Sequence, residues 1–411
     1  MKNLILQPRI VVIAMTSLLV SYACESELDN TLPQRVVSAQ LKTTNTHMIT
    51  NGMDLTVING VLSQAQSGDV IEVESGTYDI TGKLELKDGI TLKKQAGATS
   101  PPIFSAMSSS ASQMLEQDWK TGNKNVTIEG ITFYNIRFKI ENADGISFND
   151  CIFDYGVRKA GTDKWKDTND AYIQIVNSIN MKVESCVFKR RAGNSGRGIF
   201  VKQSNDTKIT KNTFGDTDAT AYFVTAINDN STRTLIEENI INRNASWVNK
   251  AETDHGIYAH SFDGLTVNKN TISGWPANGE GGAVKARNGK NLTITENTMN
   301  DSGIILNVYK NLPTNYLENV VIVNNKINLK LNTKGNNIYS GIGYWKDTND
   351  VNYYEKSIRI EGNTLTNGFL NISASNLDTA NFNENGGGIR NNTAAEFSIP
   401  SGIDQSNNTT I

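Results

Sequence analysis

The sequence has little cysteine, histidine or proline, and these shortages exclude several classes of protein. Its 411 residues include 3 cysteines, 3 histidines and 7 prolines. No CxxC pair and no His/Cys spacing typical of a zinc site occurs. A hydrophobic fraction of 38% with so few prolines is typical of a soluble, strand-rich protein rather than a disordered one. The net charge of -3 argues against binding to nucleic acid, which needs strongly basic surfaces.

Long apolar runs are also missing. The apolar run Ile10–Val20 follows Lys2 and Arg9, is too short to span a bilayer, and predicts an export signal over residues 1–23. A small residue before Cys24 resembles the signal of bacterial lipoproteins, which implies that Cys24 carries a lipid anchor. Simple secretion is the alternative. The acidic residues after Cys24 resemble the tether of surface-exposed lipoproteins in Gram-negative glycan degraders. That resemblance implies an outer-membrane lipoprotein on the periplasmic or cell-surface side.

The rest of the chain divides into a tether and one long domain. Residues 24–50 are polar and lack periodicity, which predicts a flexible tether. Residues 54–65 have the pattern of a short amphipathic helix that would cap the open end of a stack of strands. From about residue 80 onward, short alternating strands are separated by turns rich in Gly and Asn. We therefore expect a single β domain over residues 51–411, and a monomer.

What the sequence does have is an eight-residue unit that occurs nine times. Residues 207–214 read TKITKNTF, residues 265–272 read LTVNKNTI, and residues 292–299 read LTITENTM. Weaker copies end at Phe133, Phe153, Phe188, Ile241, Ile327 and Leu365. Strand-like units that recur every ~20–40 residues indicate a protein in which each copy stacks on the one before.

One position of the repeat identifies the fold. Its sixth residue is Ile131, Cys151 and Cys186 in the first copies, and then Asn212, Asn239, Asn270, Asn297, Asn325 and Asn363. Six asparagines in register predict a ladder of side-chain amides at the strand spacing of about 4.8 Å. Such a ladder at a tight turn is typical of the right-handed parallel β-helix, an all-β fold. A β-propeller, the alternative, would need more even repeats with antiparallel turns.

Cys151 and Cys186 occupy the same position of consecutive copies, so they should stack inside the helix. A buried pair of free thiols is the prediction, and an exported location leaves a disulfide as the alternative.

A second strand precedes each repeat, and counting back from the sixth position aligns these strands. Residues twelve and ten places back should face outward, because their neighbours are small or apolar. The first outward set is Gln174, Phe200, Ile227, Tyr258 and Lys285, and the second is Val176, Lys202, Asp229, His260 and Arg287. This alignment places Tyr258 beside Lys285 and His260 beside Arg287, one strand spacing apart.

The patch Tyr258, His260, Lys285 and Arg287 suits one reaction in particular. Cleavage of a uronic-acid polymer by β-elimination removes a proton next to a carboxylate. That step needs a cation to neutralise the carboxylate, a base for the proton, and an acid for the leaving oxygen. A permanently charged, forked Arg287 fits the first role. Lys285, Tyr258 and His260 are the candidates for base and acid, and stabilisation of the developing charge should be the largest contribution.

Residues 55–380 resemble the parallel β-helix polysaccharide lyases. The segments 254–258 (DHGIY) and 284–287 (VKAR) are similar to their catalytic face. In alginate lyases of family 31, a Tyr and a Lys on that face do the work, which implies catalytic roles for Tyr258 and Lys285. Family 6 is the runner-up: Arg287-Asn-Gly289 matches its Arg-His-Gly with Asn for His, and His260-Ser261 stands where it has Lys-Ser. The calcium of that family is therefore unsupported, and we expect no required cofactor.

Further residues are predicted to bind the polymer beside this patch. Cations and aromatic side chains near the cleft could grip carboxylates or stack on sugar rings; a solvated loop or a packed loop is the alternative for each. These residues are Lys202, Arg197, Arg191, His255 and Trp275, with Trp247 in a neighbouring turn.

The predicted function is thus an exported lyase for an anionic polysaccharide, alginate first. A mannuronan C5-epimerase or a dermatan- or chondroitin-type lyase would use the same proton abstraction. A hydrolase fits less well, because no pair of aspartates stands in adjacent outward positions. The alternative of another class is a surface β-helix that binds glycans without turnover.

Overall fold

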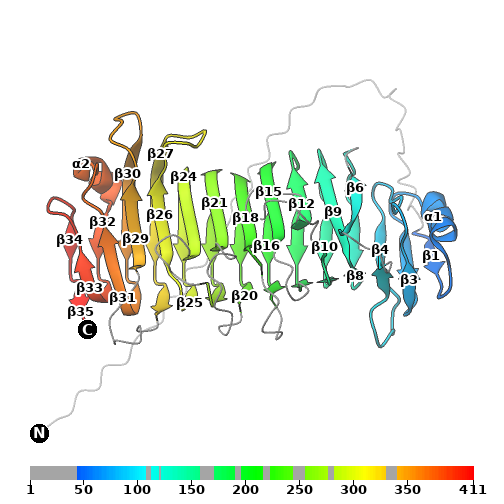
Figure 1. The fold of residues 1–411 in the computed structure, drawn as a ribbon. Coiled ribbons are helices and arrows are strands. Elements are labelled where there is room, and N and C mark those ends of the chain that lie inside the picture. Colours follow the sequence, from blue (N-terminus) through cyan, green and yellow to red (C-terminus); the bar gives the residue numbers. More distant parts are fainter. Residues whose placement is uncertain are drawn as a thin grey trace, which may run out of the picture. The chain divides into compact units, whose positions relative to one another are not determined.

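A computed structural model describes residues 44–107, 113–119, 122–157, 171–189, 196–215, 223–243, 255–275, 282–329 and 340–411. The strands of the described residues, 35 in number, pair in parallel with the strands one coil before and after them. The fold is a right-handed parallel β-helix, as the repeat predicted. Three stacks of strands run along it (Figure 1).

The first stack holds the first half of each repeat. Its strands are β1 (Thr46–Ile49), β2 (Val70–Val73), β4 (Thr91–Lys94), β7 (Thr127–Glu129), β10 (Ser147–Asn149), β13 (Lys182–Glu184), β16 (Lys208–Thr210), β19 (Leu235–Glu237), β22 (Thr266–Asn268), the end of β24 (Gly282–Thr295), β27 (Tyr316–Val323), β30 (Tyr354–Glu361), β32 (Gly388–Arg390) and β34 (Gln405–Ser406).

The second stack holds the last residues of each repeat. Its strands are β3 (Thr77–Asp79), β5 (Ile103–Ser105), β8 (Thr132–Tyr134), β11 (Ile152–Asp154), β14 (Val187–Phe188), β17 (Thr213–Phe214), β20 (Ile240–Asn242), β23 (Thr271–Ser273), β25 (Thr298–Asn300), β28 (Lys326–Asn328), β31 (Thr364–Ile372), β33 (Thr393–Ser398) and β35 (Thr409–Thr410).

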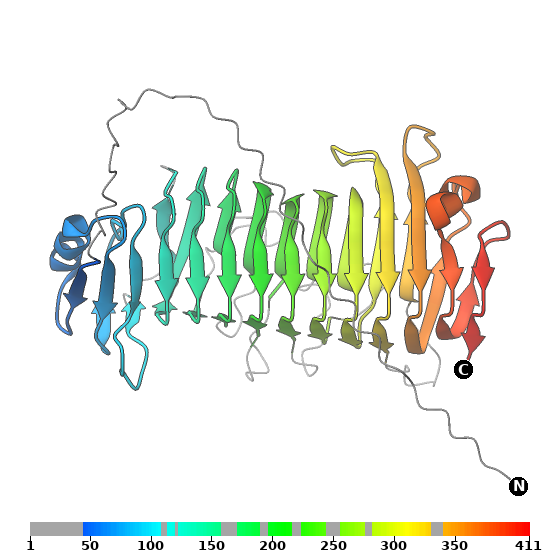
Figure 2. The ribbon, with the colours of Figure 1, turned by 180° about the vertical axis from the view of Figure 1, so that it is seen from behind.

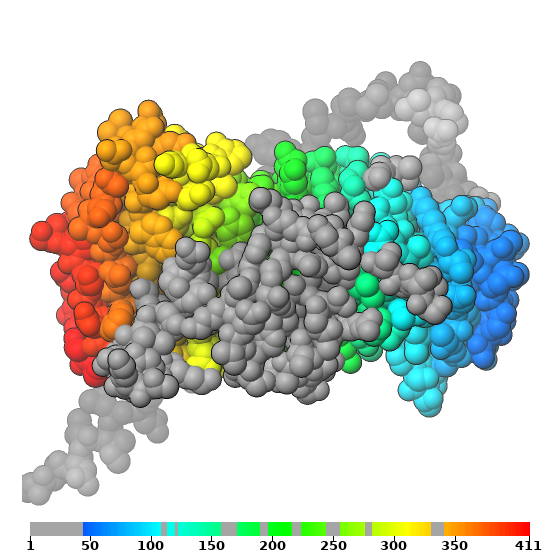
Figure 3. Space-filling model, in the orientation of Figure 1, coloured from blue at the N-terminus to red at the C-terminus, as the bar shows by residue number. Residues whose placement is uncertain are grey.

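The third stack carries the candidate site. Its strands are β6 (Leu115–Trp119), β9 (Ile136–Glu141), β12 (Ala171–Val176), β15 (Arg197–Asn205), β18 (Thr225–Thr232), β21 (His255–Asp263), the start of β24, β26 (Ile304–Val308), β29 (Ser340–Lys346) and the end of β31. They include those labelled β9, β12, β15, β18 and β21 in Figure 1; Figure 2 shows the opposite side, with the long yellow and orange arrows of β27 and β30 in front. In the space-filling view the colours form successive bands, because coils adjacent in sequence lie side by side (Figure 3).

The apolar positions of the repeat fill the interior of the helix. Phe153, Phe188 and Phe214 lie in register, with ring centres 4.8 and 4.6 Å apart and nearly parallel planes. All three are fully buried. A column of stacked rings of this kind packs one coil on the next without cavities.

The predicted asparagine ladder is present. From Asn212 to Asn363, each side-chain amide nitrogen donates to the amide oxygen of the asparagine one coil on, at 2.9–3.0 Å. The structure extends the ladder by two members, Asn392 and Asn408. Their copies of the repeat end in the small Ala394 and the polar Thr410 in place of a large apolar residue, which is why the pattern did not reveal them.

At its other end the ladder continues into the cysteines. The Cys186 backbone N–H donates to the Asn212 side chain at 2.9 Å, and the Cys151 N–H lies 3.4 Å from the Cys186 sulfur. Both cysteines are fully buried and free. The predicted stacked pair of thiols is therefore confirmed.

A helix stands at the first coil, as predicted. Helix α1 (Leu55–Gln64) begins after Asp54, whose side chain accepts a hydrogen bond from the Val57 N–H at 2.9 Å, and it buries Ile58 and Leu62. The predicted tether requires one correction. Residues 46–49 form β1, which pairs in register with β2, so the β-helix begins before residue 50. A strand of four residues is too short to show a periodic pattern in the sequence, which explains the error. Residues 24–43 lie outside the described residues.

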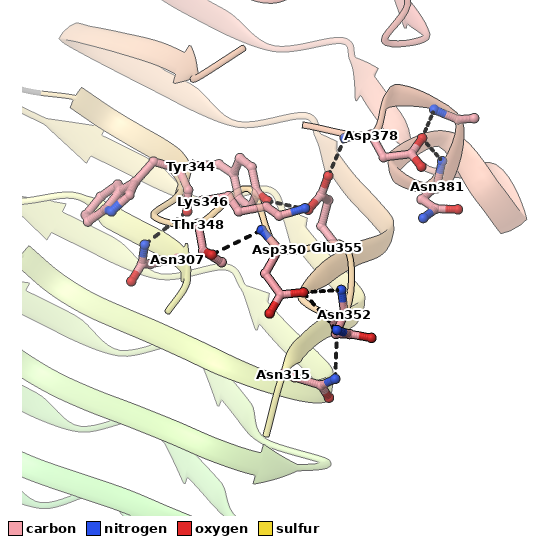
Figure 4. Close-up of polar contacts among 12 residues, drawn as sticks. Asn307, Asn315, Tyr344, Lys346, Thr348, Asp350, Asn352, Glu355, Asp378 and Asn381 are labelled. Carbon is pink, nitrogen blue, oxygen red and sulfur yellow. Dashed lines mark hydrogen bonds and ion pairs between the residues drawn. The ribbon is translucent and has the colours of Figure 1, made fainter. Parts of the chain in front are cut away.

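A buried polar network ties the last coils together (Figure 4). Glu355, fully buried, accepts a hydrogen bond from the Tyr344 hydroxyl at 2.8 Å and pairs with Lys346 at 3.6 Å. Its other oxygen accepts from the backbone of Asp378, the N-cap of helix α2 (Thr379–Asn383), which is followed by a 3-10 turn, η3 (Glu384–Gly386). Burial, and then the Glu355 charge, raise the pKa of Tyr344 above its usual range.

None of the helices in the described residues is both long enough and apolar enough to span a membrane. The predicted export signal and the predicted lipid attachment residue Cys24 lie outside those residues.

Candidate functional site

A cavity of about 470 Å³ lies on the outer face of the third stack, over β9, β12, β15, β18 and β21. Two rows of outward side chains line it. The Tyr258 row consists of Lys139, Gln174, Phe200, Asn228 and Tyr258, and continues past the cavity to Lys285. The His260 row consists of Glu141, Val176, Lys202, Asn230 and His260, and continues to Arg287. Arg197 and Thr225 complete the lining.

The register predicted between β21 and β24 is confirmed. Tyr258 pairs with Lys285, and His260 pairs with Arg287, between β21 and β24. Ile257 and Ala259, the neighbours of Tyr258, are fully buried in the core. The alternation of a strand with one face packed inward therefore decides which side chains reach the cavity.

The register predicted for β18 is wrong by one residue. Asn228 pairs with Tyr258, and Asp229 pairs with Ala259, so Ile227 and Asp229 point inward. The neighbouring strands each carry one extra residue with positive φ, at Gln203, Ser261 and Asn288, and β18 has none there. The coil through β18 is one residue shorter, which shifts every count made from its ladder asparagine.

Asp229 is consequently a buried acid and not a cavity residue. It accepts hydrogen bonds from the Ser231 hydroxyl and, at 3.0 Å, from the Thr234 hydroxyl. Burial raises the pKa of Asp229 to about 6, although the two hydroxyls oppose the shift.

Arg287 is held between two aromatic rings. Its Nη1 donates to the Tyr258 hydroxyl oxygen at 3.3 Å, and its guanidinium carbon lies 5.6 Å from the centre of the Tyr258 ring. On the other side the Tyr309 ring is 4.7 Å away. Stacking of this kind fixes the plane of a guanidinium.

Tyr309 was missed by the sequence reasoning because it lies beyond β26, outside the aligned strands. Asn288 holds it in place: the Asn288 amide oxygen accepts from the Tyr309 N–H at 2.7 Å, and its nitrogen donates to the Tyr309 carbonyl at 2.9 Å. Asn288 is fully buried. Asn288 thus fixes the backbone that presents Tyr309 to Arg287.

His260 is half-buried beside Tyr258, with ring centres 5.4 Å apart. Burial, and then the charges of Arg287 and Lys202, lower the pKa of His260 to about 4. The imidazole is therefore neutral at physiological pH and can accept a proton. Among the described residues, none makes a hydrogen bond to its Nδ1.

Lys285 lies outside the cavity lining. Its side chain is 2% exposed, and its ammonium nitrogen is 5.6 Å from the centre of the Trp345 ring. A side chain so covered adds positive charge next to Tyr258 and Arg287, whereas direct contact with a substrate would require the cover to open.

The predicted polymer-binding residues are placed as follows. Lys202 and Arg197 line the cavity. His255 is buried and stacks on Tyr258, with ring centres 5.4 Å apart, so it supports the site from behind. Trp275 is fully buried and has no face to offer a sugar, which corrects its expected role. Arg191 and Trp247 lie outside the described residues.

Metal ligands are not gathered in the part of the chain that the structure describes. No group of three or more His, Cys, Asp or Glu side chains there is arranged to hold an ion.

Comparisons with known proteins show the fold. No protein-family model and no curated protein matches the sequence. The structure is similar to PfbA, a surface adhesin of Streptococcus pneumoniae, at 15% identity over 87% of this chain and 89% of that one, with a TM-score of 0.55. It is also similar to a family 28 exopolygalacturonase of Yersinia enterocolitica, at 12% identity over 90% and 78% of the two chains, with a TM-score of 0.52.

A third similar structure is a mannuronic acid-specific family 6 lyase from human gut microbiota. It is 16% identical over 88% of this chain and 91% of that one, with a TM-score of 0.48. The first two likenesses show a shared parallel β-helix fold, and the third adds nothing to that conclusion.

Proposed function

We propose that the protein is a polysaccharide lyase that cleaves a uronic-acid polymer, alginate first, by β-elimination. The observation that supports this is the meeting of Tyr258 and neutral His260 at one end of a cavity, with Arg287 bonded to Tyr258 just beyond the lining. A carboxylate clamp, a proton acceptor and a hydroxyl donor are the three groups that the reaction needs.

The reaction runs as follows in this proposal. Arg287 pairs with the carboxylate of the uronate and so makes its C5 proton more acidic. The Nε2 or Nδ1 atom of His260 takes that proton. The electrons of the C5–H bond form the C4–C5 double bond, the bond from C4 to the glycosidic oxygen breaks, and the Tyr258 hydroxyl gives its proton to that oxygen. Proton return from His260 to Tyr258, directly or through water, restores the site.

His260 is a better base than Lys285 on geometric grounds. The imidazole lines the cavity and is unprotonated at neutral pH, whereas Lys285 is covered beside Trp345. Lys285 acts in this proposal through its charge, by stabilising the anion that forms next to Arg287.

We propose that Arg287 neutralises the carboxylate without a metal. Activity should then be unchanged when the protein is dialysed against a chelator. Loss of activity that added calcium restores would contradict this part of the proposal.

The deciding experiment measures the ultraviolet absorbance of unsaturated product with polymannuronate, polyguluronate, dermatan sulfate, hyaluronan and pectate. One substrate should give product with the native protein, and Tyr258→Phe and His260→Ala should each lower its rate about 100-fold or more. Tyr316→Phe is the matched control, since Tyr316 is an outward tyrosine on β27 of another stack. Full activity of both Tyr258→Phe and His260→Ala would contradict the proposed site. Deuterium uptake at C5 without unsaturated product would indicate an epimerase.

Glycan binding without turnover is the second candidate. PfbA, which shares the fold, is described as a surface adhesin. Binding of the same polymers with no product, and no effect of Tyr258→Phe on the binding constant, would favour this function.

We further propose that the protein is exported, anchored by a lipid at Cys24, and monomeric. Cys24→Ser should move the protein from the membrane fraction to the soluble fraction, where light scattering should give the mass of one chain. If the native protein is itself found in the soluble fraction, it has no lipid anchor and is simply secreted.

A further inference from the structure

The cavity extends well beyond the proposed catalytic groups. From Tyr258 the Tyr258 row continues through Asn228, Phe200 and Gln174, on β18, β15 and β12. Three strand spacings of about 4.8 Å place Gln174 about 14 Å from Tyr258 along the row. A pyranose unit in an extended chain is about as long as one spacing, so this stretch has room for further sugars of the same chain.

Two side-chain amides in this stretch are buried and incompletely paired. Gln174 is 7% exposed and Asn228 is 6% exposed. Among the residues that the structure describes, none donates a hydrogen bond to Gln174 Oε1 or to Asn228 Oδ1. Buried amides are nearly always paired in folded proteins, so an unpaired couple in a cavity wall needs an explanation. An amide that turns by 180° exchanges its donor and its acceptor, which suits hydroxyl groups, since they offer both.

Phe200 stands between the two amides, one strand from each. It lines the cavity with the small part of its surface that is exposed, 6%, although its neighbours on this row are polar. A flat apolar ring flanked by two amides matches the face of a pyranose, which is apolar across its C–H bonds and polar around its hydroxyl rim.

Cations lie beside this group: Lys139, which pairs with Glu141, precedes Gln174 in the Tyr258 row, and Arg197 also lines the cavity. Lys202 is adjacent to Phe200 in the His260 row and is exposed. Asn228 and Asn230, the two outward residues of β18, carry no charge. Across β18 the cavity wall therefore offers hydrogen bonds only, and the next cation after Lys202 in the His260 row is Arg287.

We propose that Gln174, Phe200 and Asn228 form a second carbohydrate subsite, which holds a sugar by its hydroxyl groups and ring face. Lys202 binds a carboxylate at the edge of this subsite. The inference deepens the proposed function, on which it rests for the identity of the polymer. It assigns recognition of sugar configuration to residues that take no part in the chemistry.

The test uses hexasaccharides of mannuronate, guluronate and dermatan sulfate as probes, with calorimetry on the His260→Ala protein to prevent turnover. Asn228→Leu and Gln174→Leu, added to that background, should each raise the Kd of the bound probe about fivefold, the usual effect of one lost hydrogen bond. In the native background the same substitutions should raise KM and leave kcat unchanged.

Asn371→Leu is the matched control. Asn371 is an exposed amide of the same outward row, reached from Lys285 through Ile305 and Gly343, and it lies beyond the cavity. Its replacement should leave the Kd unchanged. Thermal melting of each variant separates lost binding from lost folding.

Unchanged Kd values in both amide variants would overturn the subsite, as would failure of the His260→Ala protein to bind any of the three probes. The proposed function fails separately. If a probe binds and the amide variants weaken it, but the native protein releases no unsaturated product, the subsite stands and the lyase assignment falls.

Discussion

Arg287 and Tyr258 are joined across neighbouring coils by a hydrogen bond of 3.3 Å from the guanidinium to the phenol oxygen. The Tyr309 ring closes the other side of the guanidinium at 4.7 Å. This arrangement fixes both the plane of Arg287 and the direction of the Tyr258 hydroxyl. Both must be fixed for one group to hold a carboxylate while the other meets the leaving oxygen.

Replacing Arg287 by lysine should lower kcat/KM about 100-fold, although the charge is kept. Lysine cannot form the two-pronged contact with a carboxylate and does not stack flat between Tyr258 and Tyr309. Product formation on the substrate identified by the screen measures the effect. Tyr309→Phe, which keeps the ring, should remain within about twofold of native activity, and an equal loss in Tyr309→Phe would show that the ring is not what matters.

The pKa of His260 can be read directly, because the chain has only 3 histidines. NMR titration should give a value of about 4, and Lys202→Met should raise it, since the Lys202 charge contributes to the lowering. Activity should hold from neutral pH down to about pH 5 and disappear below about pH 4, where the base is protonated. A value at the ordinary 6.5 or above would refute the buried, cation-flanked environment.

The same shift has a consequence for stability. The folded pKa of His260 lies below the unfolded value of 6.5, so the unfolded chain binds the proton more tightly. His260 therefore costs stability progressively as pH falls from about 6.5 to about 4, and costs nothing above that window. The free energy of unfolding of His260→Gln, measured by urea denaturation at pH 7 and pH 4, should depend less on pH than that of the native protein.

Asp229 should have the opposite sign of pH dependence. Its folded pKa of about 6 exceeds the ordinary value of 3.8 for an aspartate, so the folded state binds the proton more tightly. The contribution of Asp229 to the free energy of unfolding is fully present below about pH 4 and falls by about 3 kcal/mol as pH rises through 6. Relative to the native protein, Asp229→Asn should gain stability between pH 4 and pH 8, as measured by urea denaturation. A constant difference would mean that Asp229 is not buried in the folded protein.

The middle of the asparagine ladder should matter more than its end. Asn270→Ala removes the acceptor of the Asn239 N–H and amide nitrogen, both inside the helix, and should lower the free energy of unfolding by about 3 kcal/mol. Asn408→Ala, at the half-buried last rung, should cost about 1 kcal/mol. Equal losses in the two variants would argue against a ladder that gains strength from burial.

Much of the fold could be predicted because the repeat carries it. Asn212 and its successors gave the ladder, and the strands twelve residues before them gave Tyr258 beside Lys285 and His260 beside Arg287. The count failed only where a coil changed length: β18 lacks the extra positive-φ residue of its neighbours, so Asp229 turned inward. The repeat tolerates substitution at most positions, so the loss of one residue from the coil through β18 leaves no visible mark in the sequence.

The candidate site was predicted less completely than the fold. Tyr309 reaches Arg287 from a connection that follows no repeat, and the cover over Lys285 comes from Trp345, two coils further on. For Trp275 the sequence left open whether the ring stacks on a sugar or packs inside the protein, and the structure shows that it packs inside. In each case the deciding contact joins segments whose spacing in sequence is irregular.

By itself the sequence determined the period of the coil and, on every aligned strand except β18, which residues face inward and which form the two outward rows. These follow from local physics, since a strand with one buried face must alternate and a ladder must stay in register. Only the tertiary structure decided which members of the rows are open and which are covered. Exposure depends on the turns between coils and on distant rings such as Tyr309 and Trp345, whose positions are fixed by packing rather than by the repeat.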